Sequence, residues 1–285
     1  EDNTASTVTK AVNKAVSHII KIINNCTQND TTVTIKDVNI DVGRGYDAAI
    51  EVRGAGDTTL KLEGDNTLRG GDGYAGLEKD DKFSTGKLTI TAEDTNASLK
   101  AYSYSFGAGI GGGNGQSTSK LEIANGKIYA EGGDHAAGIG GGCGGNGEVT
   151  ISGGEVDAYG KFNATGIGGS GIGSGKVTIK NGKVTAKTNG NAAAIGGGTL
   201  GSGDVTILDG TVTTTLVNNN IPVTGIGGGP FSTKKSTIRI LGGVVDAVGG
   251  GYGSGIGGGN GDAEVEIGGG AQVTAKGGPG GSDYY

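Results

Sequence analysis

Short runs of alternating apolar and polar residues recur along most of the chain. Residues 149–151 and 177–179 both read Val-Thr-Ile, with an aliphatic side chain at every second position. A period of two is typical of a short strand with one buried face. Asn-Gly, Asp-Gly or Gly-Gly dipeptides follow many of these runs, and such residues readily form sharp corners. The pattern therefore predicts many short strands separated by tight turns.

One isoleucine embedded in glycine marks each repeat, as in the segment GAGIGGGNG at residues 107–115. The six markers, at intervals of 28 to 31 residues, are Ile110, Ile139, Ile167, Ile195, Ile226 and Ile256. Ile50 and Leu77 occupy the same place in two less regular upstream copies, which brings the number of turns to about eight.

A coil accounts for this spacing better than a series of hairpins. Dipeptide turns can join antiparallel strands, but hairpins do not require one residue type to return to one slot in every repeat. In a coil, each slot stacks on its copy in the next turn, about 4.8 Å away. We predict an all-β fold, a right-handed parallel β-helix with three sides and about eight turns of ~29 residues.

The ends of such a coil expose strand edges that must be covered. At the N-terminus, apolar residues recur at helical spacing: Val8, Val12, Ala15, Val16, Ile19, Ile22 and Ile23. We predict an N-terminal α-helical cap in residues 1–31, the β-solenoid domain in residues 32–276, and a flexible C-terminal tail in residues 277–285. A helix that binds a partner is the alternative role for the first segment.

The glycines around the markers are expected to point outward and to leave one face of the coil almost without side chains. This glycine set consists of Gly109, Gly111, Gly138, Gly140, Gly168, Gly196, Gly227 and Gly257. Glycine in a strand costs roughly 0.5–1 kcal/mol relative to alanine. A face made of glycines therefore requires an explanation in packing or in function. Either neighbouring backbone packs closely over it, or it offers a flat surface to sugar rings or to a second copy of the chain.

Composition narrows the choice of partner. The formal net charge of −6 argues against nucleic acid and anionic membranes as partners. No apolar run is long enough to insert in a bilayer. The chain has no methionine, so we expect that a secretory signal has been removed before Glu1, with a trimmed or tagged start as the alternative. An extracellular or cell-surface location is the corresponding expectation.

Residues that carry chemistry are few, and we predict no catalytic residues. Cys26 and Cys143 should lie several turns apart and remain free thiols, and with His18 and His135 they match no metal-binding spacing. Acidic residues gather in the early turns, where Asp72, Glu78, Asp80 and Asp81 form a candidate calcium site. Solvated loop charge is the alternative. Arginines in the same turns leave polysaccharide lyase chemistry open, and no cofactor besides calcium is expected.

A row of threonines on the outer face is a further feature. Thr150, Thr178 and Thr206 should align, which is a feature of ice-binding solenoids, but Glu122, Arg239 and Glu266 interrupt the row. Ordinary strand preference also explains threonine at these places.

The sequence from Thr32 to Lys276 resembles the glycine-rich β-helical repeats of large secreted surface proteins of Gram-positive anaerobic bacteria. The segments that carry the resemblance are TLKLEGDNTLRGGDGYAGLE, KLTITAED, SLKAYS and GAGIGGGNG. The resemblance implies an extracellular parallel β-solenoid with an adhesive or carbohydrate-binding role. A more distant similarity is to β-helical modules that bind acidic plant polysaccharides with calcium.

Our interpretation is a non-catalytic extracellular β-solenoid that acts in adhesion or in surface or polysaccharide binding. The expected partner is a glycan or a host or cell-surface component, and self-association would use the glycine set or the cap helix. Three alternatives stay open: a lyase-like polysaccharide enzyme, an ice-binding protein and the receptor-binding tip of a phage fibre.

Overall fold

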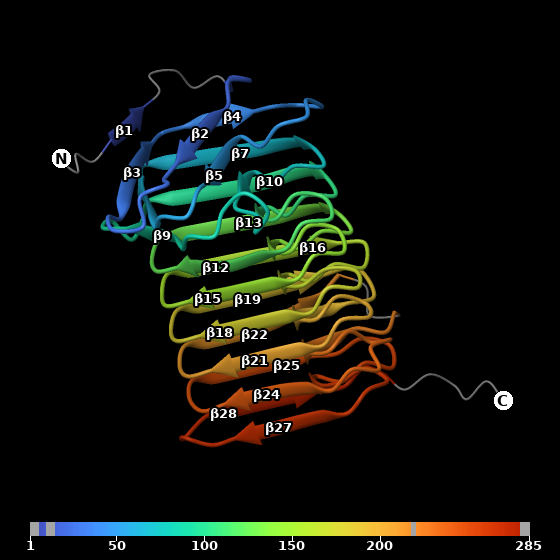
Figure 1. Ribbon diagram of the computed structural model, residues 1–285. Helices are drawn as coiled ribbons and strands as arrows, with labels where there is room; N and C mark the ends of the chain where they lie inside the picture. The colour runs from blue at the N-terminus through green and yellow to red at the C-terminus, as the bar shows by residue number, and fades with distance from the viewer. Residues whose placement is uncertain (1–5, 10–14, 218–220, 280–285) are drawn as a thin grey trace.

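The computed structural model describes residues 6–9, 15–217 and 221–279 of the chain, which form a coil of about nine turns (Figure 1). Three parallel sheets of ten, nine and nine strands run along the coil, and the coil is of the right-handed type. Each strand pairs in parallel with its counterpart in the next turn, as β15 (Gly147–Ile151) does with β18 (Gly175–Ile179). The prediction of a three-sided parallel solenoid is thereby confirmed, although the structure has about nine turns where the sequence predicted about eight.

Each sheet collects one strand from successive turns. Sheet A contains β1 (Ser6–Thr9), β3 (Thr31–Lys36), β6 (Thr58–Glu63), β9 (Leu88–Ala92), β12 (Thr118–Ile123), β15, β18, β21 (Gly203–Ile207), β24 (Ser236–Ile240) and β27 (Ala263–Ile267). Sheet B contains β4 (Asn39–Asp41), β7 (Asp65–Asp72), β10 (Ser98–Ser105), β13 (Lys127–Asp134), β16 (Glu155–Lys161), β19 (Lys183–Thr188), β22 (Thr211–Leu216), β25 (Val244–Val248) and β28 (Gln272–Lys276). Sheet C contains β2 (Ile20–Ile23), β5 (Ile50–Arg53), β8 (Leu77–Glu78), β11 (Ile110–Gly111), β14 (Ile139–Gly140), β17 (Ile167–Gly168), β20 (Ala193–Gly196), β23 (Thr224–Gly227) and β26 (Ile256–Gly257).

The marker isoleucines form one continuous column inside the coil. Ile139 is directly paired with Ile110 on one side and Ile167 on the other. The column continues through Ile195, Ile226 and Ile256, and upstream through Leu77, Ile50 and Ile20. Burial of each such side chain contributes roughly 1.5–3 kcal/mol. The in-register aliphatic columns are therefore the main source of stability in this slender fold.

The predicted N-terminal helical cap is wrong. Strands β1 and β2 occupy parts of the segment assigned to it, and the described residues contain no helix. Ile20 pairs with Ile50 and Ile22 with Val52, which adds a further rung to sheet C. The cause is the β-branched character of this segment, because valine and isoleucine favour strands once a pairing edge is available. Residues 10–14 of the predicted helix lie outside the described residues.

The last turn of the coil leaves apolar side chains exposed. At the C-terminal end, Val265 and Ile267 of β27 are exposed, because no further turn stacks on them in the described part of the chain. Residues 280–285 of the predicted tail lie outside the described residues.

Cys26 and Cys143 are both free thiols, as predicted. Across residues 15–217 and 221–279, no helix has the length and apolarity to cross a membrane.

Candidate functional site

A groove of about 600 Å³ lies on the outside of the early turns, along β5 and β8 of sheet C and the loops beside them. Its lining combines four carboxyl groups, two cations, four aromatic rings and two amides. These are Glu51, Asp72, Glu78 and Asp80, then Arg53 and Lys82, then Tyr46, Tyr74, Phe83 and Phe106, and finally Asn114 and Gln116. This is a mixed surface of rings and hydrogen-bonding groups open to solvent.

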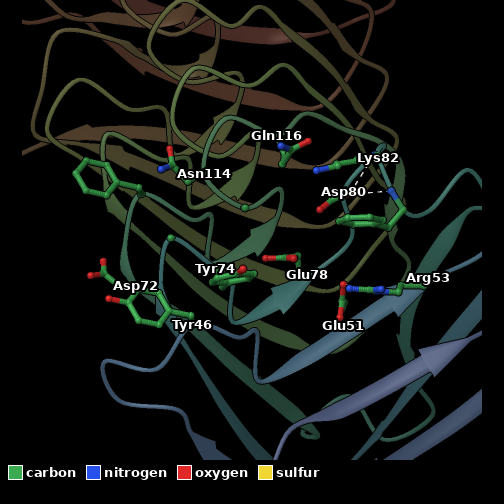
Figure 2. A pocket seen from close by; sticks show the side chains of 14 residues that line it. Tyr46, Glu51, Arg53, Asp72, Tyr74, Glu78, Asp80, Lys82, Asn114 and Gln116 are labelled. Atoms are coloured by element: carbon green, nitrogen blue, oxygen red, sulfur yellow. Dashed lines mark hydrogen bonds and ion pairs between the residues drawn. The ribbon is translucent and has the colours of Figure 1, made fainter.

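The groove occurs where one column of sheet C changes its residue type. The residue after the marker is glycine from β11 onward, but it is glutamate in β5 and β8. Glu51 pairs with Glu78, and Glu78 pairs with Gly111, so these residues are successive members of one column. Two carboxyl side chains thereby occupy a column that carries none in the later turns. Figure 2 shows Tyr74 and Glu78 in the middle of the groove, with Glu51 and Arg53 to one side.

The glycine half of that column is buried under neighbouring backbone. A Cβ added to Gly140 would lie 2.0 Å from the carbonyl oxygen of Gly168, at a φ of +136° that favours glycine. All eight members of the glycine set are buried. The close-packing alternative therefore describes their surroundings. These buried glycines therefore offer little surface to a ligand.

Glu78 is a buried carboxyl group at the floor of the groove, with 3% of its surface exposed. Its Oε2 accepts a hydrogen bond from the Ala75 backbone N–H at 3.0 Å. Burial raises the pKa of Glu78 to about 8, and the negative charges of Asp80 and Glu51 act in the same direction, against the Ala75 hydrogen bond and Arg53. Near neutral pH, Glu78 is therefore largely a neutral acid that can donate its proton to a ligand.

Glu51 lies between two cations. Its Oε1 accepts a short hydrogen bond from Arg53 Nε, and its Oε2 lies 3.5 Å from Lys21 Nζ. The hydrogen bond with Glu51 raises the pKa of Arg53. The Arg53 guanidinium also lies over the Phe83 ring, 4.5 Å from the ring centroid. Arg53 thus connects a carboxylate of the groove floor with an aromatic ring of its wall.

Asp80 and Phe83 belong to the loop between β8 and β9, residues 79–87, which is longer than the corresponding loop of residues 141–146 between β14 and β15. Asp80 Oδ1 accepts hydrogen bonds of 3.0 Å from the backbone N–H groups of Lys82 and Phe83. Burial raises the pKa of Asp80 despite these bonds. The carboxyl group therefore organises a turn that presents Phe83 at the rim of the groove.

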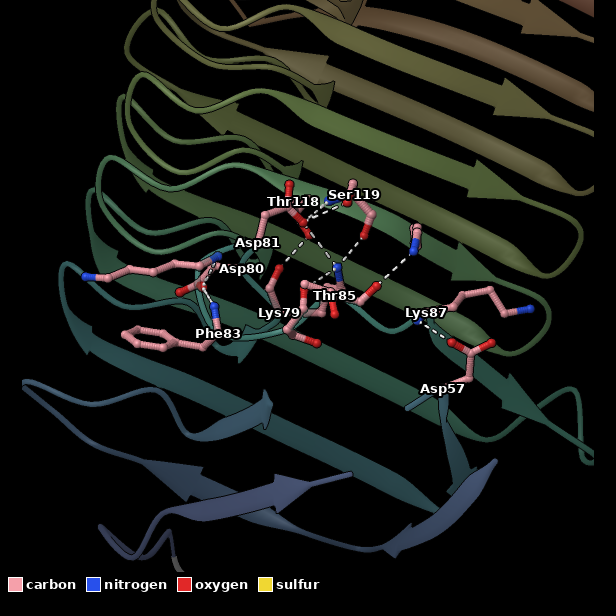
Figure 3. A network of polar contacts seen from close by, with 12 residues as sticks. Asp57, Lys79, Asp80, Asp81, Phe83, Thr85, Lys87, Thr118 and Ser119 are labelled. Carbon is pink, nitrogen blue, oxygen red and sulfur yellow. Dashed lines mark hydrogen bonds and ion pairs between the residues drawn. The ribbon is translucent and has the colours of Figure 1, made fainter. Parts of the chain in front are cut away.

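Lys79 anchors the same loop from inside the coil (Figure 3). Its side chain has no exposed surface, and its Nζ lies 2.6 Å from the Ser119 carbonyl oxygen and 3.2 Å from the Ser84 carbonyl oxygen and Asp81 Oδ1. Burial lowers the pKa of Lys79, while Asp81 opposes this shift. The ammonium group ties the loop to the next turn of the coil.

The four predicted calcium ligands separate into two groups. Asp72, Glu78 and Asp80 line the groove, whereas Asp81 accepts from the backbone N–H of Ser119 at 2.9 Å and pairs with Lys79. Over the described ranges, no group of three or more His, Cys, Asp or Glu side chains is placed to hold a metal ion.

Sequence reasoning did not select several residues that complete the groove. Glu51, Tyr74, Asn114 and Gln116 were not among the candidate site residues, although all line it. For Glu51 a signal existed, because glutamate follows the marker only in the two irregular upstream copies. For Tyr74, Asn114 and Gln116 the sequence contains no such signal, because the paths of the loops, rather than the repeat, bring these residues together.

Four segments of the chain are similar to a known repeat family. Residues 121–143, 149–176, 177–199 and 238–260 match the family model described as beta helix repeat, which supports a parallel β-helix repeat region. Comparison with curated proteins and with solved structures gave no match. The matched segments all follow the groove in the sequence, so they bear on the fold and carry no information about the site.

Proposed function

We propose that the protein is a polysaccharide-binding β-solenoid whose binding site is the groove of the early turns. The observation that carries this proposal is the combination of exposed rings with a buried neutral acid. Tyr46 has 75% of its surface exposed, and Phe83 is also exposed. Aromatic faces pack on the apolar faces of sugars, while carboxyl, guanidinium and amide groups bond their hydroxyls.

The charge of the groove favours a neutral polysaccharide. Four carboxyl groups and only two cations line it. Even with Glu78 protonated, the other three carboxyl groups outnumber the cations, so a chain of uronic acids would meet net repulsion. Neutral glucans, xylans and mannans carry no such charge. We therefore expect neutral β-linked chains to bind, in contrast to the acidic polymers that the distant calcium-dependent similarity implies.

Adhesion outside the cell is part of the same proposal. It is supported by the resemblance to secreted surface proteins and by the solenoid fold, which presents side chains along a long surface. A glycan of a host or a neighbouring cell would be the partner.

Affinity electrophoresis in gels that contain hydroxyethyl cellulose, xylan, mannan or polygalacturonate tests the binding proposal. We expect retardation by at least one neutral polymer, none by polygalacturonate, and loss of retardation in Tyr74→Ser. Tyr252→Ser is the matched control, because Tyr252 is an exposed tyrosine on a distant turn. Migration of the native protein unchanged by every neutral polymer would end the proposal.

A second candidate function is acid–base cleavage of the bound polysaccharide. It is favoured by the pKa of about 8 at Glu78, which suits a general acid, with the Glu51 carboxylate in the same groove. Glycosidases use such a pair, one carboxylic acid to protonate the leaving oxygen and one carboxylate as base or nucleophile. The sites of binding and cleavage would then be the same.

Glu78→Gln separates the two functions. Glutamine keeps the size of the side chain and a hydrogen-bond donor but cannot release a proton, so binding near neutral pH should persist. If the protein cleaves the chain, the variant should release no new reducing ends, and native activity should fall as the pH rises through about 8. No release of reducing ends by the native protein on any bound polymer would remove the second function and leave the first.

A further inference from the structure

Three ring side chains stand one above another at the corner between sheets B and C. They are Phe106, His135 and Phe162, each in the turn that follows β10, β13 or β16. The Phe106 and His135 ring centroids are 6.4 Å apart with planes inclined by 7°, and those of His135 and Phe162 are 6.4 Å apart with planes inclined by 40°. We call these three residues the corner ladder.

The backbone is strained at every step of the corner ladder. The φ angles of Phe106, His135 and Phe162 are +57°, +60° and +41°, in the left-handed region that glycine adopts without cost. Ring-bearing residues in this region cost on the order of 1–3 kcal/mol each. A chain with 65 glycines supplies the unstrained residue at most of its other corners. Strain repeated in three successive turns indicates that the side chains are needed there.

The two phenylalanines of the ladder are exposed, His135 is half-buried, and the ladder continues the groove. Phe106 lines the groove and is the first member of the ladder, so the two surfaces meet at this residue. At the other end, Phe162 has 55% of its surface exposed, although aromatic side chains in folded proteins are usually buried. In the next turn, Asn189 Oδ1 accepts from the Phe162 N–H at 2.8 Å, and no ring continues the row. The ladder is therefore a short extension of the groove along the coil axis.

We propose that the corner ladder holds the continuation of a neutral polysaccharide chain whose first sugars occupy the groove; this rests on the function proposed above. The ladder has one ring in each of three successive turns, with centroids 6.4 Å apart, so the rings form a row along the coil axis. A row of rings in consecutive turns can contact an extended chain over more of its length than a branched or coiled one.

The test compares short and long ligands of the same chemistry. The double variant His135→Asn, Phe162→Asn removes the two ladder rings that do not line the groove. Asparagine tolerates positive φ, so the fold should be kept. The matched control, Phe231→Ser with Tyr252→Ser, removes two exposed rings from later turns. Isothermal titration is carried out with the trisaccharides and hexasaccharides of cellulose, xylan and mannan.

For the series that the native protein binds, we expect the ladder variant to weaken hexasaccharide binding by about tenfold and to leave trisaccharide binding within about twofold. The control should change neither. Equal weakening of both lengths, or of neither, would overturn the ladder proposal while binding in the groove stands. If the native protein binds none of the oligosaccharides, the groove proposal and the ladder proposal both fall.

Discussion

In sheet C, the column formed by the residue after each marker differs between the early and the later turns. In the later turns it is a line of glycines, and from Gly111 to Gly227 each of them lies against the backbone of the next turn. In the second and third turns the same positions are Glu51 and Glu78, and a groove opens beside them. The same slot in the repeat thus serves close stacking in one region and a recessed polar surface in the other. Regular stacking provides the scaffold, and a local departure from it provides the site.

A side chain placed in the glycine half of the column should disrupt the close stacking of the turns. Gly168→Ala would put its Cβ 2.1 Å from the Gly196 carbonyl oxygen at a φ of +131°. We expect a loss of about 2–6 kcal/mol from overpacking and backbone strain, seen as a lower urea midpoint of unfolding. Gly268→Ala, with nothing within 4 Å of the added Cβ, is the control and should change little. An unchanged urea midpoint in Gly168→Ala would show that close stacking does not require glycine.

The glutamate half should make stability depend on pH. The pKa of Glu78 is about 8 in the folded chain and near 4.5 when unfolded, so the unfolded state releases this proton first as the pH rises. Stability should therefore fall by about 3–4 kcal/mol between pH 5 and pH 8 through this group alone. Urea unfolding at both pH values should show that the free energy of unfolding of Glu78→Gln falls less between pH 5 and pH 8 than that of the native protein. Parallel pH profiles for the two proteins would mean that Glu78 ionises without cost.

The stability of the loop at residues 79–87 should depend on the buried side chain of Lys79. Lys79→Met keeps the apolar stem but removes the donor to the Ser84 and Ser119 carbonyl oxygens. We expect a loss of about 1–3 kcal/mol, the cost of leaving buried carbonyls unpaired. Amide hydrogen exchange should become faster in residues 79–87 and stay unchanged around β18. Unchanged exchange in this loop would show that Lys79 does not hold it.

The ion pairs between turns should matter least. Lys183 Nζ lies 2.7 Å from Glu155 Oε1 on exposed surface, one turn apart in sheet B. Such pairs are screened by water and salt. Lys183→Ala should leave the urea midpoint unchanged within error. A clear decrease would mean that charge pairing, as well as burial, holds the turns in register.

The sequence predicted the fold well where the repeat is regular. The spacing of Ile139, Ile167 and Ile195 was enough to predict the stacking and its register, because each residue contacts its own copy in the next turn. The same approach failed for residues 15–23, where valine and isoleucine also fit helical spacing. Period counting cannot detect that an open strand edge at β5 favours the extended form.

The candidate site was predicted only in part. Glu78 and Asp80 were recognised as acidic residues close in sequence, but their burial and raised pKa values arise from the fold around them. Tyr74 and Gln116 come to the groove from different turns, through loops that do not follow the repeat. A site built from departures from a repeat is the part of a solenoid that repeat analysis describes least.

We propose that Glu51 and Glu78, the two glutamates of the column, mark a polysaccharide site. A crystal structure with a bound hexasaccharide of cellulose, xylan or mannan, whichever binds in titration, tests it most directly. We expect sugar density against Glu78, Arg53 and Tyr74 that continues toward Phe106. Sugar bound elsewhere, such as along the row Thr150, Thr178 and Thr206, with the groove empty, would contradict it.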